Sequence, residues 1–129
     1  MQNQALNAYN KVSKQTATPR QLESSLLAKS AAHFQRIRDN WDDAQADLEA
    51  AMLFNRRLWT VFMTSVTRDD NPLPKQIRQN VANLGLFIMN RQLELLRNPE
   101  ARKLDALINI NRELAAGLRA MAPPGGDAG

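Results

Sequence analysis

The chain has 129 residues, a net charge of +4 and no cysteine, and 43% of its residues are hydrophobic. These values fit one soluble domain with its own core, and the lack of cysteine excludes disulfides and thiolate metal sites. The longest apolar run, LGLFIM, is far shorter than the roughly 20 residues that cross a bilayer, so no membrane insertion is expected. The N-terminal residues lack the apolar core of a signal peptide, and we therefore expect a cytoplasmic protein.

Strand patterns are nearly absent from the sequence, whereas helix boundaries are clear. The pattern predicts an all-α fold, a small single-domain helical bundle with four long helices and a short N-terminal helix. The expected helices cover residues 4–15, 19–40, 43–67, 74–97 and 98–120. Thr18 and Asn98 are expected to cap the second and last helices, each followed by proline at the first helical position. The folded domain should span residues 4–120, and residues 121–129, rich in proline and glycine, should form a disordered tail.

Two asparagines interrupt the apolar stripes of the third and last expected helices. Asn55 lies in FNRRLW between Phe54 and Trp59, and Asn111 is followed by arginine as Asn55 is. If both stripes face the core, the two amides can satisfy one another, which matters because a buried unpaired amide costs about 1–3 kcal/mol. Such a pair would fix helix register, as polar core positions do in coiled coils. We interpret Asn55 and Asn111 as an internal polar clasp. The alternatives are that both lie at the solvent edge or face a partner.

No catalytic or cofactor motif is present in the sequence. His33 is the single histidine, and glycine is absent wherever a phosphate-binding loop would need it. We therefore expect no enzyme activity, no cofactor and no metal. The lysines and arginines are spread over all helices and do not alternate with aromatic residues as they do in single-strand binders. A nucleic-acid interface is accordingly the weaker interpretation of the positive charge.

Four stretches occur in the order and spacing of one protein family: TPRQLE, FNRRLW, NPLPKQIRQNVANLGLFI and LDALININREL. Through them the chain resembles the FlaF family of flagellar biosynthesis regulators over nearly the whole expected domain. The resemblance implies a cytoplasmic, non-enzymatic regulator of flagellin production and export. It also implies flagellin as the partner, with the chain acting alongside or against an FlbT-type regulator.

The hypothesis that joins these observations is a secretion chaperone that covers an amphipathic end of newly made flagellin. The fourth expected helix is apolar on more than one face, so a groove bordered by the second, third and fourth helices could receive a partner helix. The candidate partner-binding residues are Phe87, Met89, Leu93 and Tyr9, with Arg56 and Arg57 as rim charges. The alternatives are binding to flagellin mRNA, an adaptor role toward an FlbT-type protein, and a bundle that fills its own apolar surface.

Overall fold

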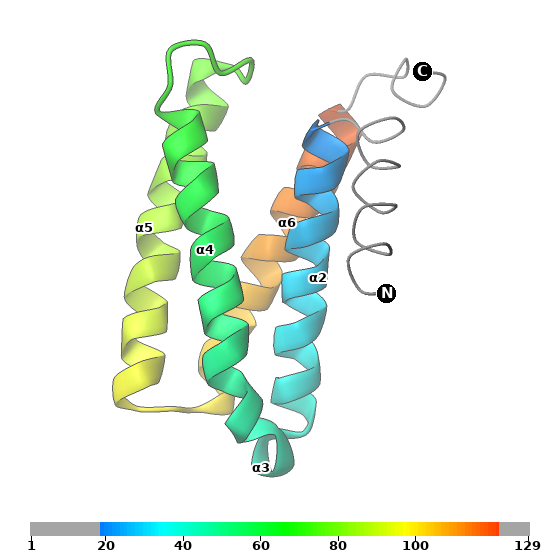
Figure 1. Cartoon of the computed structure of the whole chain (residues 1–129), viewed down its shortest axis with the longest axis vertical. Coiled ribbons are helices and arrows are strands. Elements are labelled where there is room, and N and C mark those ends of the chain that lie inside the picture. The colour runs from blue at the N-terminus through cyan, green and yellow to red at the C-terminus, as the bar shows by residue number, and fades with distance from the viewer. Residues whose placement is uncertain (1–18, 122–129) are drawn as a thin grey trace, which may run out of the picture.

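The computed structural model describes residues 19–121, and within this range the chain consists of helices and their connections (Figure 1). The long helices are α2 (Pro19–Asp39), α4 (Leu48–Val66), α5 (Lys75–Arg97) and α6 (Leu104–Met121). The short elements are α3 (Trp41–Ala44) and the 3-10 turns η1 (Gln45–Asp47) and η2 (Ala101–Lys103). Residues 19–121 contain no strand, so the predicted all-α fold with four long helices is confirmed. The helix expected at 4–15, the Thr18 cap and the tail beyond Met121 lie outside the described residues.

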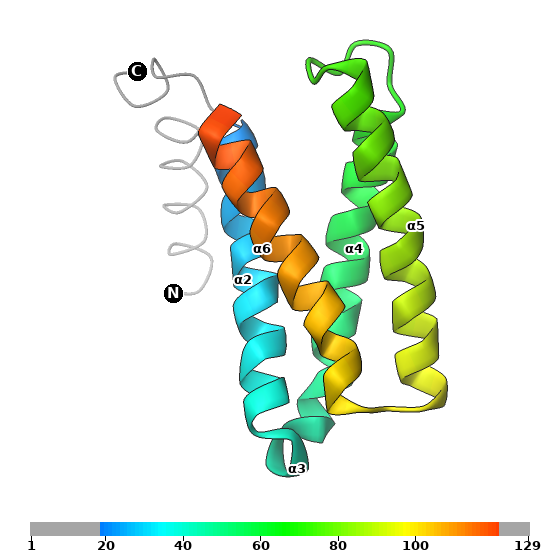
Figure 2. The ribbon, with the colours of Figure 1, turned by 180° about the vertical axis from the view of Figure 1, so that it is seen from behind.

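The four long helices run alternately up and down and form two antiparallel pairs (Figures 1 and 2). Helix α2 packs most extensively on α6, α4 packs on α5, and contacts between α2 and α4 join the two pairs. Helices α5 and α6 make few contacts with each other. They lie close where a short connection joins them and diverge toward the other end of the molecule (Figure 2). The bundle is therefore closed at one end and opens between its two pairs at the other.

The most extensive packing in the bundle is between α2 and α6. Small side chains on this seam allow it, and the Ser24 hydroxyl donates a hydrogen bond of 2.7 Å to the carbonyl oxygen of Ala115. Near the closed end, the Arg38 guanidinium donates to both carboxylate oxygens of Asp105. The core that these contacts enclose includes fully buried Trp59 and Phe34.

Two predicted helix starts are wrong. The third helix is interrupted by η1, so α4 begins at Leu48, and Asp42 and Asp43 lie inside the first turn of α3 without capping it. The last helix begins at Leu104 rather than beside Pro99. Asn98 instead ends the preceding helix, because its backbone N–H donates to the Glu94 carbonyl oxygen at 2.8 Å. Asn98 followed by Pro99 has the sequence of a helix start. In this structure the same residue ends α5, and the next α-helix begins only at Leu104.

Candidate functional site

The divergence of α5 and α6 leaves a groove made of three adjoining hollows. A hollow of about 520 Å³ lies at the open end of the bundle, and hollows of about 260 and 570 Å³ follow along the helices. Neighbouring hollows share their walls: Val81 and Leu114 line the first and second, and Leu84 and Ile110 line the second and third. We call this continuous surface the α5–α6 groove.

Most of the residues that line the α5–α6 groove are apolar, and Asn80 and Asn83 add polar side chains to its α5 wall. The apolar lining includes Phe62, Val66, Ile77, Val81, Leu84, Phe87, Ile110, Leu114 and Leu118. Several of these belong to the core, since Val81 and Leu118 are only 3% and 2% exposed. Apolar core residues that border an open hollow lack the close packing of a protein interior. The groove is therefore a place where the bundle's own core is left incomplete by the described residues.

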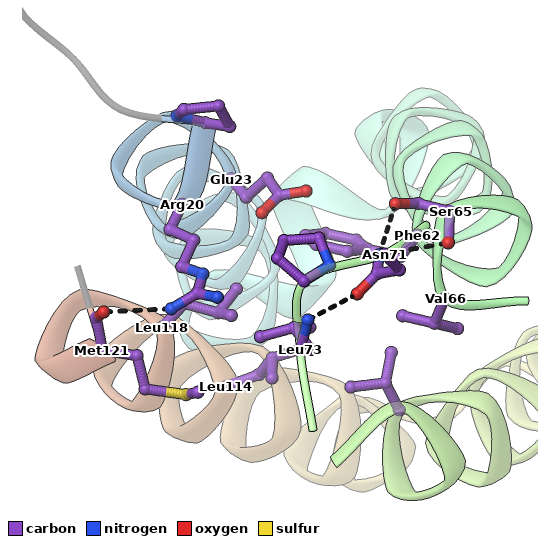
Figure 3. Close-up of a pocket in the computed structure, with 13 residues that line it drawn as sticks. Arg20, Glu23, Phe62, Ser65, Val66, Asn71, Leu73, Leu114, Leu118 and Met121 are labelled. Carbon is purple, nitrogen blue, oxygen red and sulfur yellow. Dashed lines mark hydrogen bonds between the residues drawn. The ribbon is translucent and has the colours of Figure 1, made fainter. Parts of the chain in front are cut away.

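The open end of the groove carries the charged residues Arg20 and Glu23 of α2 (Figure 3). The Glu23 side chain points into the hollow, whereas Arg20 turns toward the end of α6 and donates to the Met121 carbonyl oxygen at 3.0 Å. Burial raises the pKa of the Glu23 carboxyl, and the nearby charge of Arg20 opposes that shift in part. An acid thus faces an otherwise apolar space.

The segment between α4 and α5 forms one wall of this open end, and Asn71 holds its shape (Figure 3). The Asn71 amide nitrogen donates to the Ser65 carbonyl oxygen and hydroxyl at 3.1 and 2.9 Å. Its amide oxygen accepts the Leu73 N–H at 2.9 Å. These bonds place Leu73 and Pro72 against the hollow, so this wall is fixed to the end of α4.

A buried network of polar side chains joins the two helix pairs. Asn111 of α6 donates to the amide oxygen of Asn55 of α4 at 2.9 Å, and both residues are 0% exposed. The Ser30 hydroxyl of α2 donates to the same Asn55 oxygen at 2.9 Å. The Asn55 nitrogen donates to Gln92 of α5, also at 2.9 Å. The two asparagines that we interpreted as a polar clasp are thus in direct contact. Each of the four long helices supplies one residue to this network.

Two further bonds complete this polar network. The Trp59 indole N–H donates to the Asn111 oxygen at 2.9 Å, and Gln92 donates to the Met52 carbonyl oxygen at 3.1 Å. Sequence reasoning missed Gln92, although it continues the buried face of α5 at helical spacing from Ile88. It also treated Trp59 as an apolar core residue only. In FNRRLW, Asn55 and Trp59 therefore bind the same partner, one turn apart.

The predicted partner-binding residues do not form one surface. Phe87, 41% exposed, lines the α5–α6 groove. Arg56, Met89 and Leu93 instead line a separate hollow of about 330 Å³ on the outer side of α4 and α5. Arg57 is exposed and lines neither hollow, and Tyr9 lies outside the described residues. The expected groove bordered by the second, third and fourth helices stays a prediction: α4 and α5 border the hollow around Leu93, whereas α5 and α6 border the longer α5–α6 groove.

The outer hollow has the character of a surface strip. Leu53, Leu93 and Leu96 are 44%, 55% and 60% exposed, and Glu49 and Arg56 lie beside them. Its floor includes Gln92, whose amide belongs to the buried network. We call this second surface the α4–α5 strip. Its apolar side chains are exposed to solvent, whereas several of those in the α5–α6 groove belong to the buried core.

Other classes of site have little support from the described part of the chain. Residues 19–121 contain no group of three or more histidine or acidic side chains arranged to hold a metal ion. None of the helices described is both long enough and apolar enough to cross a membrane.

The fold and the groove define a class of protein: a small antiparallel four-helix bundle with a largely apolar groove between two of its helices. A family model described as "Flagellar protein FlaF" matches residues 5–118. The chain belongs to the FlaF family, and it is a flagellar protein in that sense. No curated protein and no solved structure matches the chain.

Proposed function

We propose that the chain regulates flagellin production and export as a cytoplasmic, non-enzymatic secretion chaperone that binds a helical end of flagellin in the α5–α6 groove. Membership of the FlaF family supports the flagellar role. The observation that carries the binding mode is the apolar groove walled by α5 and α6, with buried core residues in its floor. An amphipathic helix laid in such a groove buries its apolar face.

The dimensions of the groove suit one short helical segment. The α6 wall runs from Ile110 to Met121, which is about 16 Å at the usual helical rise of 1.5 Å per residue. A parallel or antiparallel partner helix would present about three turns along this distance. Its apolar residues at three- and four-residue spacing would meet Phe87, Leu84 and Leu114 in turn. The groove would in this way cover the apolar side chains of the flagellin helix and prevent flagellin from assembling before export.

A matched pair of substitutions on one helix tests the location of the binding site. Phe87 and Leu93 are both exposed apolar residues of α5, but Phe87 lines the α5–α6 groove and Leu93 the α4–α5 strip. Phe87→Asp should weaken flagellin binding at least tenfold, because a carboxylate would replace an apolar contact. Leu93→Asp should leave the affinity within about twofold of wild type. Both proteins should stay folded by circular dichroism, and affinities are measured by titration calorimetry.

Different results would point elsewhere. Loss of binding in Leu93→Asp alone would move the site to the α4–α5 strip, together with Arg56 and Met89. An absence of binding between wild type and full-length flagellin would refute the chaperone role. In that case titration with flagellin mRNA at low and high salt would test the alternative regulator, since binding through phosphates falls steeply with salt whereas apolar contact does not. An FlbT-type protein is the third ligand to titrate.

A further inference from the structure

The open end of the α5–α6 groove differs from the rest of it in holding a carboxylate. Glu23 points into the apolar hollow between α2 and the 67–74 segment (Figure 3). The described residues give it no hydrogen bond and no ion pair within 4.0 Å, although it is only partly exposed. A partly desolvated carboxylate without a partner is unfavourable, and its raised pKa reflects this.

Among the described residues, Arg20 is the cation whose charge acts on Glu23, but it does not contact the carboxylate. Arg20, one turn earlier on α2, donates instead to the Met121 carbonyl oxygen and so closes the end of α6. Glu113 is the other acid on the groove, at the rim of the middle hollow, where it is exposed. The groove therefore presents apolar walls, one acid at its rim and one acid at its open end.

We propose that the segment bound in this groove is an amphipathic helix that carries a lysine or arginine one turn beyond its apolar stripe, and that Glu23 pairs with that basic residue. This proposal rests on the proposed function and specifies the chemistry of the segment. The apolar stripe contacts Val81, Leu84 and Leu114, and the basic side chain extends along the apolar wall to the carboxylate. Such a pair sets the direction of the bound helix, because Glu23 lies at the open end of the groove, whereas Glu113 is an exposed acid at the rim of the middle hollow.

Neutralising Glu23 tests the pairing. Glu23→Gln should weaken binding of full-length flagellin by about three- to tenfold, in keeping with the loss of a partly buried ion pair. Glu23→Lys should weaken it further, because like charges would then meet. The wild-type affinity should fall between low and high salt, and the affinity of Glu23→Gln should change less. Glu49→Gln, which removes an exposed glutamate from the α4–α5 strip, is the matched control and should bind as wild type does.

A thermal melt separates a binding effect from a folding effect. Because burial disfavours the charged form of Glu23, the neutral glutamine should leave the melting temperature at neutral pH unchanged or higher. Equal affinities of wild type and Glu23→Gln at both salt concentrations would overturn the proposed pairing and leave the chaperone role intact.

If flagellin does not bind at all, the chaperone role fails and a pair of synthetic peptides decides the pairing. The probes are 14-residue amphipathic helices with leucine at three- and four-residue spacing, identical except for lysine or glutamine one turn beyond the stripe. Preference for the lysine peptide in wild type, lost in Glu23→Gln, supports the acid-directed groove. Equal binding of both peptides, or binding of neither, overturns it.

Discussion

At the scale of single residues, the buried polar network determines how the two helix pairs meet. The Asn55 oxygen accepts from Ser30 and Asn111 while its nitrogen donates to Gln92, so three helices satisfy one amide. Only one relative position of the helices allows all these bonds, and a sliding of either pair would leave buried amides without partners. Trp59 adds a donor to Asn111, which links the largest core side chain to the same arrangement.

A double-mutant cycle on Asn55 and Asn111 measures this link. Each change to alanine should lower the free energy of unfolding by about 1–3 kcal/mol, because buried donors or acceptors on other helices lose their partner. The double mutant should lose at least about 0.5 kcal/mol less than the sum, since one bond is shared. Urea denaturation provides the values. Strict additivity would mean that the two amides contribute independently, and Ser25→Ala, at an exposed position on α2, serves as the control.

At the scale of helices, apolar periodicity predicted the long elements well and their starts less well. The predicted 74–97 and 19–40 segments differ from α5 and α2 by about one residue at their ends. The starts of α4 and α6 were misplaced, because η1 and η2 take up residues whose sequence also suits a first helical turn. A choice between a 3-10 turn and an α-helical turn depends on where the neighbouring helix ends, and single-chain patterns do not contain that information.

Gly85 shows a helix position that tertiary contact determines. Its place in mid-helix predicts a close crossing, and an added Cβ would lie 2.5 Å from the Met63 sulfur of α4. Gly85→Ala should therefore be neutral or destabilising in wild type, because Met63 must move. In the Met63→Ala background the same change should stabilise the fold by about 1 kcal/mol, the helix propensity difference. Urea denaturation of the four proteins tests this coupling. An equal effect of Gly85→Ala in both backgrounds would show that Met63 does not restrict the site.

At the scale of the whole molecule, the bundle combines a closed end with an open one. The polar network and the Arg38–Asp105 pair hold the helix pairs together, and the α5–α6 groove lies where the pairs separate. The sequence predicted the fold class, the asparagine pair and Phe87 as an exposed apolar residue. It did not predict the α5–α6 groove, because the relative position of α5 and α6 depends on tertiary contacts that the pattern of a single helix does not contain. Glu23 was likewise not predicted as a site residue, because its role depends on the hollow that its side chain faces.

Hydrogen exchange on the complete protein tests whether the partner binds at the open end of the bundle. With saturating flagellin, amide protection should rise in residues 77–87 and 110–118, which wall the groove, because a bound segment stabilises the open end. Protection on the outer surface around Leu53 and Leu93 should stay unchanged. A rise confined to that outer surface would place the partner on the α4–α5 strip instead.

Two residues at the mouth of the groove have a practical consequence for labelling. Pro19 and Met121, the first and last described residues, both line the open hollow beside Glu23. A tag joined directly to Pro19 or Met121, in place of residues 1–18 or 122–129, would therefore begin next to the mouth of the groove and compete with a ligand for it. The same position makes a good reporter: since the protein has no cysteine, a single cysteine introduced at Met121 could carry a fluorophore whose emission responds when the groove is filled.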